Sequence, residues 1–274
     1  MDPLVEYAGP ATIGSPIARL TLNSPHNRNA LSATLVNQLH QGLRAASSDS
    51  DVRAVVLTHT GNTFCAGADL SETSASSAET TTGPFETAAE RARELATLLR
   101  AIVESPLPVI VAIDGHVRAG GLGLVGAGDI AVAGPRSTFA LTEARIGVAP
   151  AIISLTLLPK MTARAAARYY LTGETFDATT AAEIGLITMA TDDVDAAVAS
   201  LVSEVGRASP QGLAASKALT TDAILAGFDC DAERLSADSA RLFVSDEARE
   251  GMLAFLQKRP PRWTPSGEGP KAAT

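Results

Sequence analysis

The chain has 274 residues, enough to bury the core of one large domain or two modest ones. Its formal net charge of -8 at pH 7 argues against sequence-independent nucleic-acid binding, because such binders carry a basic face. Two cysteines exclude a disulfide framework, the four histidines share no metal-ligand spacing, and neither a membrane span nor a secretory signal is visible, so we expect a cytoplasmic protein without a metal site.

Strands and helices alternate in the first half of the chain. The stretch IARLTL alternates as a strand does, and Ser32 stands where an N-cap would begin the amphipathic helix ATLVNQLHQGLRAAS. RAVVLTHT is a buried-type strand, followed by the small-residue loop GNTFCAGADL. Residues 71–84 are rich in Ser and Thr and have nothing to bury. Because the strand pattern resumes beyond them in PVIVAID, we interpret them as a mobile loop near the site, within one domain.

The second half is mostly helical. A long helix, FETAAERARELATLLRAIVES, ends before Pro106, and DIAVAG and STFALT read as strands. From about residue 151 we predict a series of separate helices that includes AIISLTLLPKM, GLAASKALTTDAILAG and ERLSADSARLFV, with GLITMA as one interrupting strand. We therefore divide the chain into a core that carries the site, residues 1–200, and a helical C-terminal region, residues 201–274.

Residues 121–126, GLGLVG, match the dinucleotide pattern G-x-G-x-x-G. A dinucleotide site requires this turn after the first strand, and an acid at the tip of the next strand. Here two strands and a helix come first, and the following strand ends in Gly134 with no acid. A nicotinamide-dependent oxidoreductase is therefore only a remote alternative.

Two small-residue loops, CAGAD and RAGGLGL, each follow an apolar strand. Small residues allow a ligand to approach the backbone closely. If both loops face one pocket, each can present a backbone N–H to the same oxygen and form an oxyanion hole. This arrangement stabilises an enolate or a tetrahedral oxyanion.

Together with further motifs, these loops resemble the crotonase, or enoyl-CoA hydratase/isomerase, superfamily. The matching segments are NRNALS, FCAGADL, VIVAIDGHVRAGGLGL, GDIAVA, FALTEARIGVAP and EGMLAFLQKRPPRW, and they span nearly the whole chain. The resemblance implies an α/β fold, a spiral of ββα units with a helical C-terminal trimerisation region, assembled as homotrimers or dimers of trimers. It also implies an acyl-CoA substrate and no separate cofactor, since coenzyme A is part of the substrate.

The resemblance assigns roles to individual residues. The thioester carbonyl would lie between the backbone N–H groups of Ala68 and Gly120, with Gly121 as the alternative second donor. The further substrate and coenzyme A contacts that it implies are Arg28 near the phosphates, Ala66, Asp69 and Leu70 near the adenine, Gly121 and Gly123 on the glycine turn, and Phe255 and Lys258 toward a neighbouring subunit's coenzyme A. We also interpret Asp69 and Asp129 as structural, through caps or ion pairs.

The catalytic acids depart from the family pattern. The best-known hydratases of the family carry two glutamates; Glu143 matches the second, whereas the first position holds Gly123. Losing a positioned acid–base group typically lowers a rate by about 10²–10⁴-fold. Apolar residues flank Glu143 on both sides, so we expect partial burial and a raised pKa, as a working acid–base group needs.

These residues leave three functions open. We favour an enoyl-CoA hydratase, because FALTEARIGVAPAIIS resembles relatives of methylglutaconyl-CoA hydratase. A Δ3,Δ2-enoyl-CoA isomerase is the first alternative, since one carboxylate can take a proton at C2 and return it at C4. An acyl-CoA-binding protein with impaired catalysis is the second; Gly123 suggests it and Glu143 argues against it.

Overall fold

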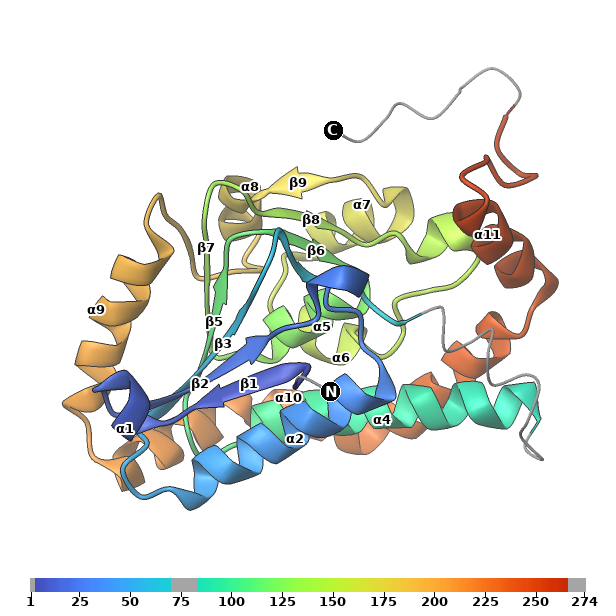
Figure 1. The fold of residues 1–274 in the computed structure, drawn as a ribbon. Coiled ribbons are helices and arrows are strands. Elements are labelled where there is room, and N and C mark those ends of the chain that lie inside the picture. Colours follow the sequence, from blue (N-terminus) through green and yellow to red (C-terminus); the bar gives the residue numbers. More distant parts are fainter. Residues whose placement is uncertain (1–2, 70–82, 266–274) are drawn as a thin grey trace.

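The computed structural model describes residues 3–69 and 83–265, in which two sheets wind as a spiral (Figure 1). Each of three repeats places one strand in the larger sheet and the next strand in the smaller one. The larger-sheet strands are β3 (Ala54–His59), β5 (Val109–Ile113) and β7 (Ile130–Ala133), followed respectively by β4 (Thr63–Cys65), β6 (His116–Arg118) and β8 (Thr138–Ala140) in the smaller sheet. Helices α4 (Pro84–Glu104) and α5 (Gly120–Ala127) complete the first two ββα units.

Short strands extend both sheets at their edges. The larger sheet has the order β1-β2-β3-β5-β7-β10, in which only β1 (Val5–Ala8) is antiparallel to its neighbour β2 (Ile17–Leu22). At its other edge, β10 (Met189–Ala190) lies within the predicted strand GLITMA. The smaller sheet has the order β4-β6-β8-β9, and β9 (Phe176–Asp177) is antiparallel to β8.

The remaining helices pack on the sheets or on one another. They are α1 (Pro10–Ile13), η1 (Pro25–Asn27), α2 (Ala33–Ser48), η3 (Glu143–Ile146), α6 (Ser154–Leu157), α7 (Ala163–Thr172), α8 (Ala178–Glu183), α9 (Val194–Gly206), α10 (Pro210–Phe243) and α11 (Asp246–Leu256). Ser32 caps α2 as predicted, because its hydroxyl accepts a bond from Leu35 N. Within the described residues, no helix combines the length and apolar character that crossing a membrane requires.

The larger sheet is buried on both faces. Val55 and Leu57 of β3 point into the main core with α2 and α4, whereas Ala54 and Val56 point the other way, into a smaller core that includes Val198 of α9. This alternation follows from the two-residue period of a strand. Figure 1 shows α9 on one side of the sheet and α2 and α4 on the other.

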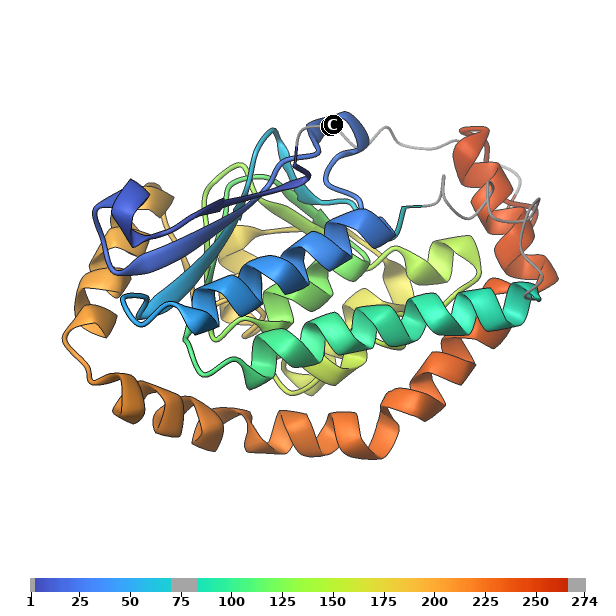
Figure 2. The same cartoon turned by 60° about the horizontal axis from the view of Figure 1, so that its bottom comes forward.

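Two helix predictions need correction. The segments GLAASKALTTDAILAG and ERLSADSARLFV belong to one helix, α10, of 34 residues, which runs along α4 and leads to α11 (Figure 2). The residues between them include no proline, so nothing interrupts the helical hydrogen bonds. In contrast, the predicted helix AIISLTLLPKM shrinks to α6, because residues 151–153 form turns and Pro159 cannot donate a backbone bond.

A buried ion pair connects α10 to the spiral. Lys217 Nζ lies 2.8 Å from Asp129 Oδ2 and donates hydrogen bonds to the carbonyls of Ile102 and Leu107. The same carboxylate oxygen accepts a bond from Val109 N at 2.7 Å. Asp129 therefore has the structural ion pair that its sequence context suggested, and it joins α10, the end of α4 and the start of β5.

Candidate active site

The two small-residue loops contact each other directly. Gly67 has a φ of +90°, and a Cβ built on it would lie 2.8 Å from Ala119 Cβ and 3.2 Å from Gly120 N. A Cβ built on Gly120 would lie 3.8 Å from Ala68 N. Position 67 therefore requires glycine for both its conformation and its space. The loops after β4 and β6 thus bring the backbone nitrogens of Ala68 and Gly120 to one place.

Both backbone N–H groups are free for a ligand by their geometry. Leu31 N donates to Gly67 O, and Asp69 N donates to Leu31 O, so the intervening Ala68 N–H points away from Leu31. Gly120 is the first residue of α5, and the first N–H groups of a helix have no partner within it. Gly121, the alternative donor, packs against Cys65, whose Cβ and carbonyl oxygen would both lie 2.8 Å from an added Cβ.

Cys65 supports this turn and is not a nucleophile. It is fully buried, and its Sγ accepts a bond from Gly67 N at 3.4 Å. Burial raises the pKa of the thiol to about 12, opposed in part by that bond. The thiol therefore stays protonated at neutral pH, and the side chain packs in the core.

Glu143 begins η3 and is buried, as predicted. Its side chain carries the one buried side-chain polar atom, Oε2, that lacks a hydrogen-bond partner among residues 3–69 and 83–265. Burial raises the pKa of Glu143 to about 7, and a bond from its own backbone N–H opposes this rise. An unpartnered buried carboxyl with a pKa near neutrality can both accept and return a proton at working pH.

Apolar side chains occupy the place of the first family glutamate. A Cβ built on Gly123 would lie 2.5 Å from Ile153 Cγ2 and 3.1 Å from Leu99 Cδ1. No carboxylate fits at position 123 unless these side chains move. The sequence did not reveal this packing, because Ile153 is 30 residues away and nothing in a local pattern pairs it with Gly123.

We predict that Gly123→Ala destabilises the fold by about 1–3 kcal/mol, because the added methyl overpacks against Ile153. Ile153→Ala removes the contacting methyl, so the same alanine should be tolerated better in that background. Urea denaturation of the two single variants and the double variant measures the coupling. An equal destabilisation in both backgrounds would contradict this account of position 123.

The segment around Arg28, expected to bind coenzyme A, is hydrogen-bonded to the CAGAD loop after β4. Arg28 O accepts a bond from Ala66 N at 3.1 Å, and Asn27 Nδ2 donates to Asp69 Oδ2 at 3.1 Å. Asp69 therefore has a structural contact, and Arg28 itself is exposed. The pKa of His116 is lowered mainly by burial and further by the charges of Arg118 and Arg28. These two arginines therefore place positive charge beside this segment. Leu70 lies outside the described residues, as does most of the Ser/Thr-rich stretch.

The C-terminal residues expected at a neighbouring coenzyme A lie around the end of α11. Phe255 is 61% exposed, and Lys258 follows the helix with a φ of 52°. The helix packs onto η3, since a Cβ on Gly251 would meet Ile146 O. The structure thus joins this helix to the segment of Glu143.

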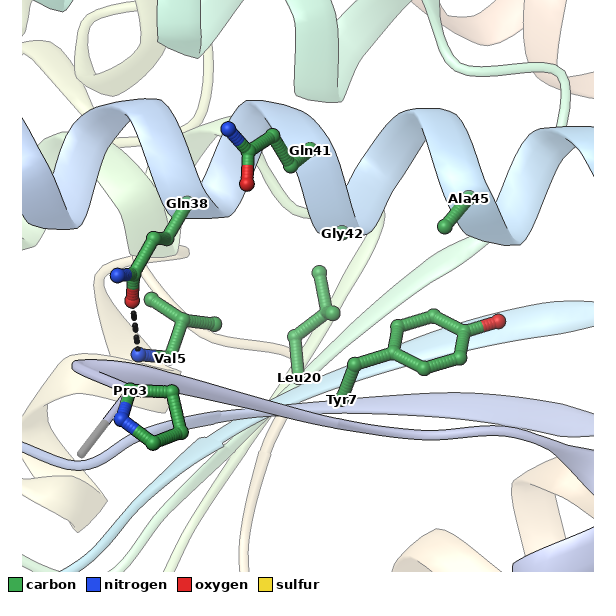
Figure 3. Close-up of a pocket in the computed structure, with 8 residues that line it drawn as sticks. All are labelled: Pro3, Val5, Tyr7, Leu20, Gln38, Gln41, Gly42 and Ala45. Atoms are coloured by element: carbon green, nitrogen blue, oxygen red, sulfur yellow. Dashed lines mark hydrogen bonds between the residues drawn. The ribbon is translucent and has the colours of Figure 1, made fainter. Parts of the chain in front are cut away.

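A separate hollow between β1 and α2 is not this site. It encloses about 290 Å³ and is lined by residues from Pro3 to Ala45, with Gln38 Oε1 accepting a bond from Val5 N at 2.8 Å (Figure 3). Its lining includes no carboxylate, histidine or cysteine. Its one titratable side chain is Tyr7, and burial, together with the charge of Asp49, raises the pKa of that phenol above its ordinary value of 10, so the phenol stays neutral at working pH.

Comparison with known proteins agrees with this geometry. The sequence model of the family described as Enoyl-CoA hydratase/isomerase matches residues 12–266. The chain belongs to this family. An enoyl-CoA hydratase from Mycobacterium avium is 74% identical, with a TM-score of 0.89 that covers 96% of this chain and 100% of that one. The confirmed crotonase-type spiral and helical C-terminal region are thus those of the hydratase/isomerase family.

More distant members of the family cover the chain equally well. The crystal structure of an enoyl-CoA hydratase from Shewanella pealeana is 31% identical, with a TM-score of 0.72 over 95% of this chain and 96% of that one. A protein of Aspergillus fumigatus named mevalonyl-coenzyme A hydratase is 30% identical over 259 residues, 91% of this chain and 92% of its own. The resemblance therefore extends over whole chains rather than a single motif.

Proposed function

We propose that this protein is an enoyl-CoA hydratase in which Glu143 is the single acid–base group. The observation that carries the proposal is the buried Glu143 carboxyl, with its unpartnered Oε2 and a pKa raised to about 7. The second support is the meeting of Ala68 N and Gly120 N, which offers an oxyanion hole for a thioester carbonyl.

The proposed reaction proceeds by proton transfer alone. Ionised Glu143 takes a proton from a water molecule while the oxygen of that water bonds to C3 of the 2-enoyl thioester. The electrons of the double bond move to the thioester oxygen, where Ala68 N–H and Gly120 N–H stabilise the enolate. Glu143 then returns the proton to C2, which gives a 3-hydroxyacyl-CoA. This sequence is balanced without any cofactor beyond the coenzyme A of the substrate.

An isomerase is the second candidate, and the environment of Gly123 favours it. Because Ile153 and Leu99 fill the space at position 123, Glu143 is the carboxylate that the described site offers for proton transfer. That carboxylate can move a proton from C2 to C4 and convert a 3-enoyl thioester into the 2-enoyl isomer. We rank hydration first because family members as similar as 74% are named hydratases.

The resemblance also supports an assembled enzyme. We propose homotrimers or dimers of trimers, in which Phe255 and Lys258 approach the coenzyme A of a neighbouring subunit. The exposed Leu253, Phe255 and Leu256 of α11 provide apolar surface for such a contact. Molar mass measured by light scattering tests this part independently of activity.

The deciding experiment incubates the protein with a 2-enoyl-CoA and, separately, with its 3-enoyl isomer, and separates the products by chromatography. We expect 3-hydroxyacyl-CoA from the 2-enoyl substrate, and none with Glu143→Gln. Conversion of 3-enoyl to 2-enoyl without hydration would make the protein an isomerase. Binding without either product would leave an acyl-CoA-binding protein.

A further inference from the structure

The hydroxyl groups of Ser154 and Tyr170 form a directed chain of hydrogen bonds. Ser154 Oγ lies 2.6 Å from Pro150 O and 3.2 Å from the phenol oxygen of Tyr170. A carbonyl can only accept, so the single Ser154 proton is bound to Pro150 O. Tyr170 must then donate its own proton to Ser154. The phenol oxygen is left with free lone pairs and can act only as an acceptor toward a third group.

This acceptor lies in the neighbourhood of Glu143. Helix α7, which carries Tyr170, is fixed to η3 by the bond from Arg145 Nε to Thr172 O at 3.1 Å. The pKa of Tyr170 is raised to about 12 by burial and further by the charge of Glu143, while the bond with Ser154 opposes the rise. The phenol therefore stays neutral at working pH and keeps the same hydrogen-bond direction.

The residues at the start of helix α6 also fill the space at position 123, where the best-known hydratases of the family carry their first glutamate. Ile153, which would contact a Cβ on Gly123, directly precedes Ser154, which holds the Tyr170 proton. The start of α6 thus removes room for a carboxylate at position 123 through Ile153 and fixes a neutral acceptor through Ser154. The attacking water in hydration has two protons, of which a single carboxylate takes one, so the other O–H is available to donate a hydrogen bond to such an acceptor.

We propose that Tyr170 is a positioning residue for hydration, whose phenol oxygen accepts a hydrogen bond from the water that Glu143 deprotonates. The inference rests on the proposed hydratase function and extends it. One water proton passes to Glu143, and the other stays on the oxygen that bonds to C3, held by Tyr170. The tyrosine proton remains on the bond to Ser154 and is not transferred.

Tyr170→Phe tests this, because it removes the phenol oxygen and keeps the ring. We expect kcat for hydration of a 2-enoyl-CoA to fall about ten- to a hundredfold, with KM changed less than about twofold. Exchange of the C2 protons of a saturated acyl-CoA with deuterium from D₂O, followed by mass spectrometry, should stay within about twofold of wild type. That exchange needs Glu143 and the oxyanion donors but no positioned water.

Tyr169→Phe is the matched control. The Tyr169 ring packs on Phe176 at a centroid distance of 4.1 Å, so this variant also loses one phenol oxygen while keeping a packed ring. The rates of hydration and of deuterium exchange in Tyr169→Phe should equal those of wild type. Equal losses of hydration and exchange in Tyr170→Phe would show a structural role and overturn the proposal, as would no loss in either rate. If wild type exchanges deuterium but forms no 3-hydroxyacyl-CoA, the proposed hydratase function itself fails, and this inference falls with it.

Discussion

Glu143→Gln should lower kcat/KM for a 2-enoyl-CoA by at least about 10²–10⁴-fold, because glutamine cannot accept and return the proton. The free enzyme must hold Glu143 ionised, so the kcat/KM of wild type should rise as pH rises through about 7, the raised pKa of this carboxyl. Initial rates measured across this pH range, and coenzyme A thioester binding measured by calorimetry, separate catalysis from affinity.

The matched control for this prediction is Glu94→Gln, which makes the same chemical change on the exposed surface of α4. It should retain the activity and the pH profile of wild type. Substantial hydration by Glu143→Gln would transfer the acid–base role to another group. A profile that is flat around neutral pH would contradict the raised pKa of the Glu143 carboxyl.

The same shift has a consequence for stability that needs no substrate. The pKa of Glu143 rises from the ordinary 4.5 to about 7 on folding, so its favourable contribution is fully present below 4.5 and is lost as pH rises through 7. Between about pH 5 and 8, the free energy of unfolding of Glu143→Gln should therefore improve relative to wild type by roughly 2–3 kcal/mol. Urea denaturation at both pH values measures this difference, which should be near zero for the exposed control.

Local patterns predicted several strands and the two loops well, because each depends on residues close together in the chain, whereas the spiral itself was implied by the family resemblance. The alternation in IARLTL fixes the faces of β2, and the small residues of CAGAD and RAGG mark turns where another backbone can approach. The resemblance then placed Ala68 beside Gly120. Their contact in the structure agrees with that placement, although their part in catalysis is still a prediction.

What the sequence could not predict depends on how helices pack. Ile153 reaches Gly123 only because α6 lies over α5, and Tyr170 meets Ser154 only through the placing of α7. A tyrosine within ARYYLTG reads as an ordinary apolar position of an amphipathic helix. Helix length was also misjudged, since the polar residues inside α10 look like a break although no backbone feature ends the helix there.

Lys217→Ala should destabilise the fold by about 3–5 kcal/mol, although it lies outside the active site. Burial lowers the pKa of Lys217, and the charge of Asp129 opposes this, so the ammonium depends on its partner. Its removal leaves the Asp129 carboxylate largely buried without a cation and leaves Ile102 O and Leu107 O without their donor. Urea denaturation should show the lower free energy of unfolding, and thermal denaturation should show a fall of about 2–4 °C in Tm for each kcal/mol lost.

The double variant Lys217→Met/Asp129→Asn separates the charge from the packing. Methionine keeps the buried stem of Lys217, and the asparagine side chain is neutral, so neither partner leaves an unpaired charge; we expect most of the stability lost in Lys217→Ala to return. Lys217→Met alone should remain destabilised, because Asp129 is still ionised and unpaired. If that single variant were as stable as wild type, the ion pair would contribute nothing, and only the packing of the stem would hold α10 against α4 and β5.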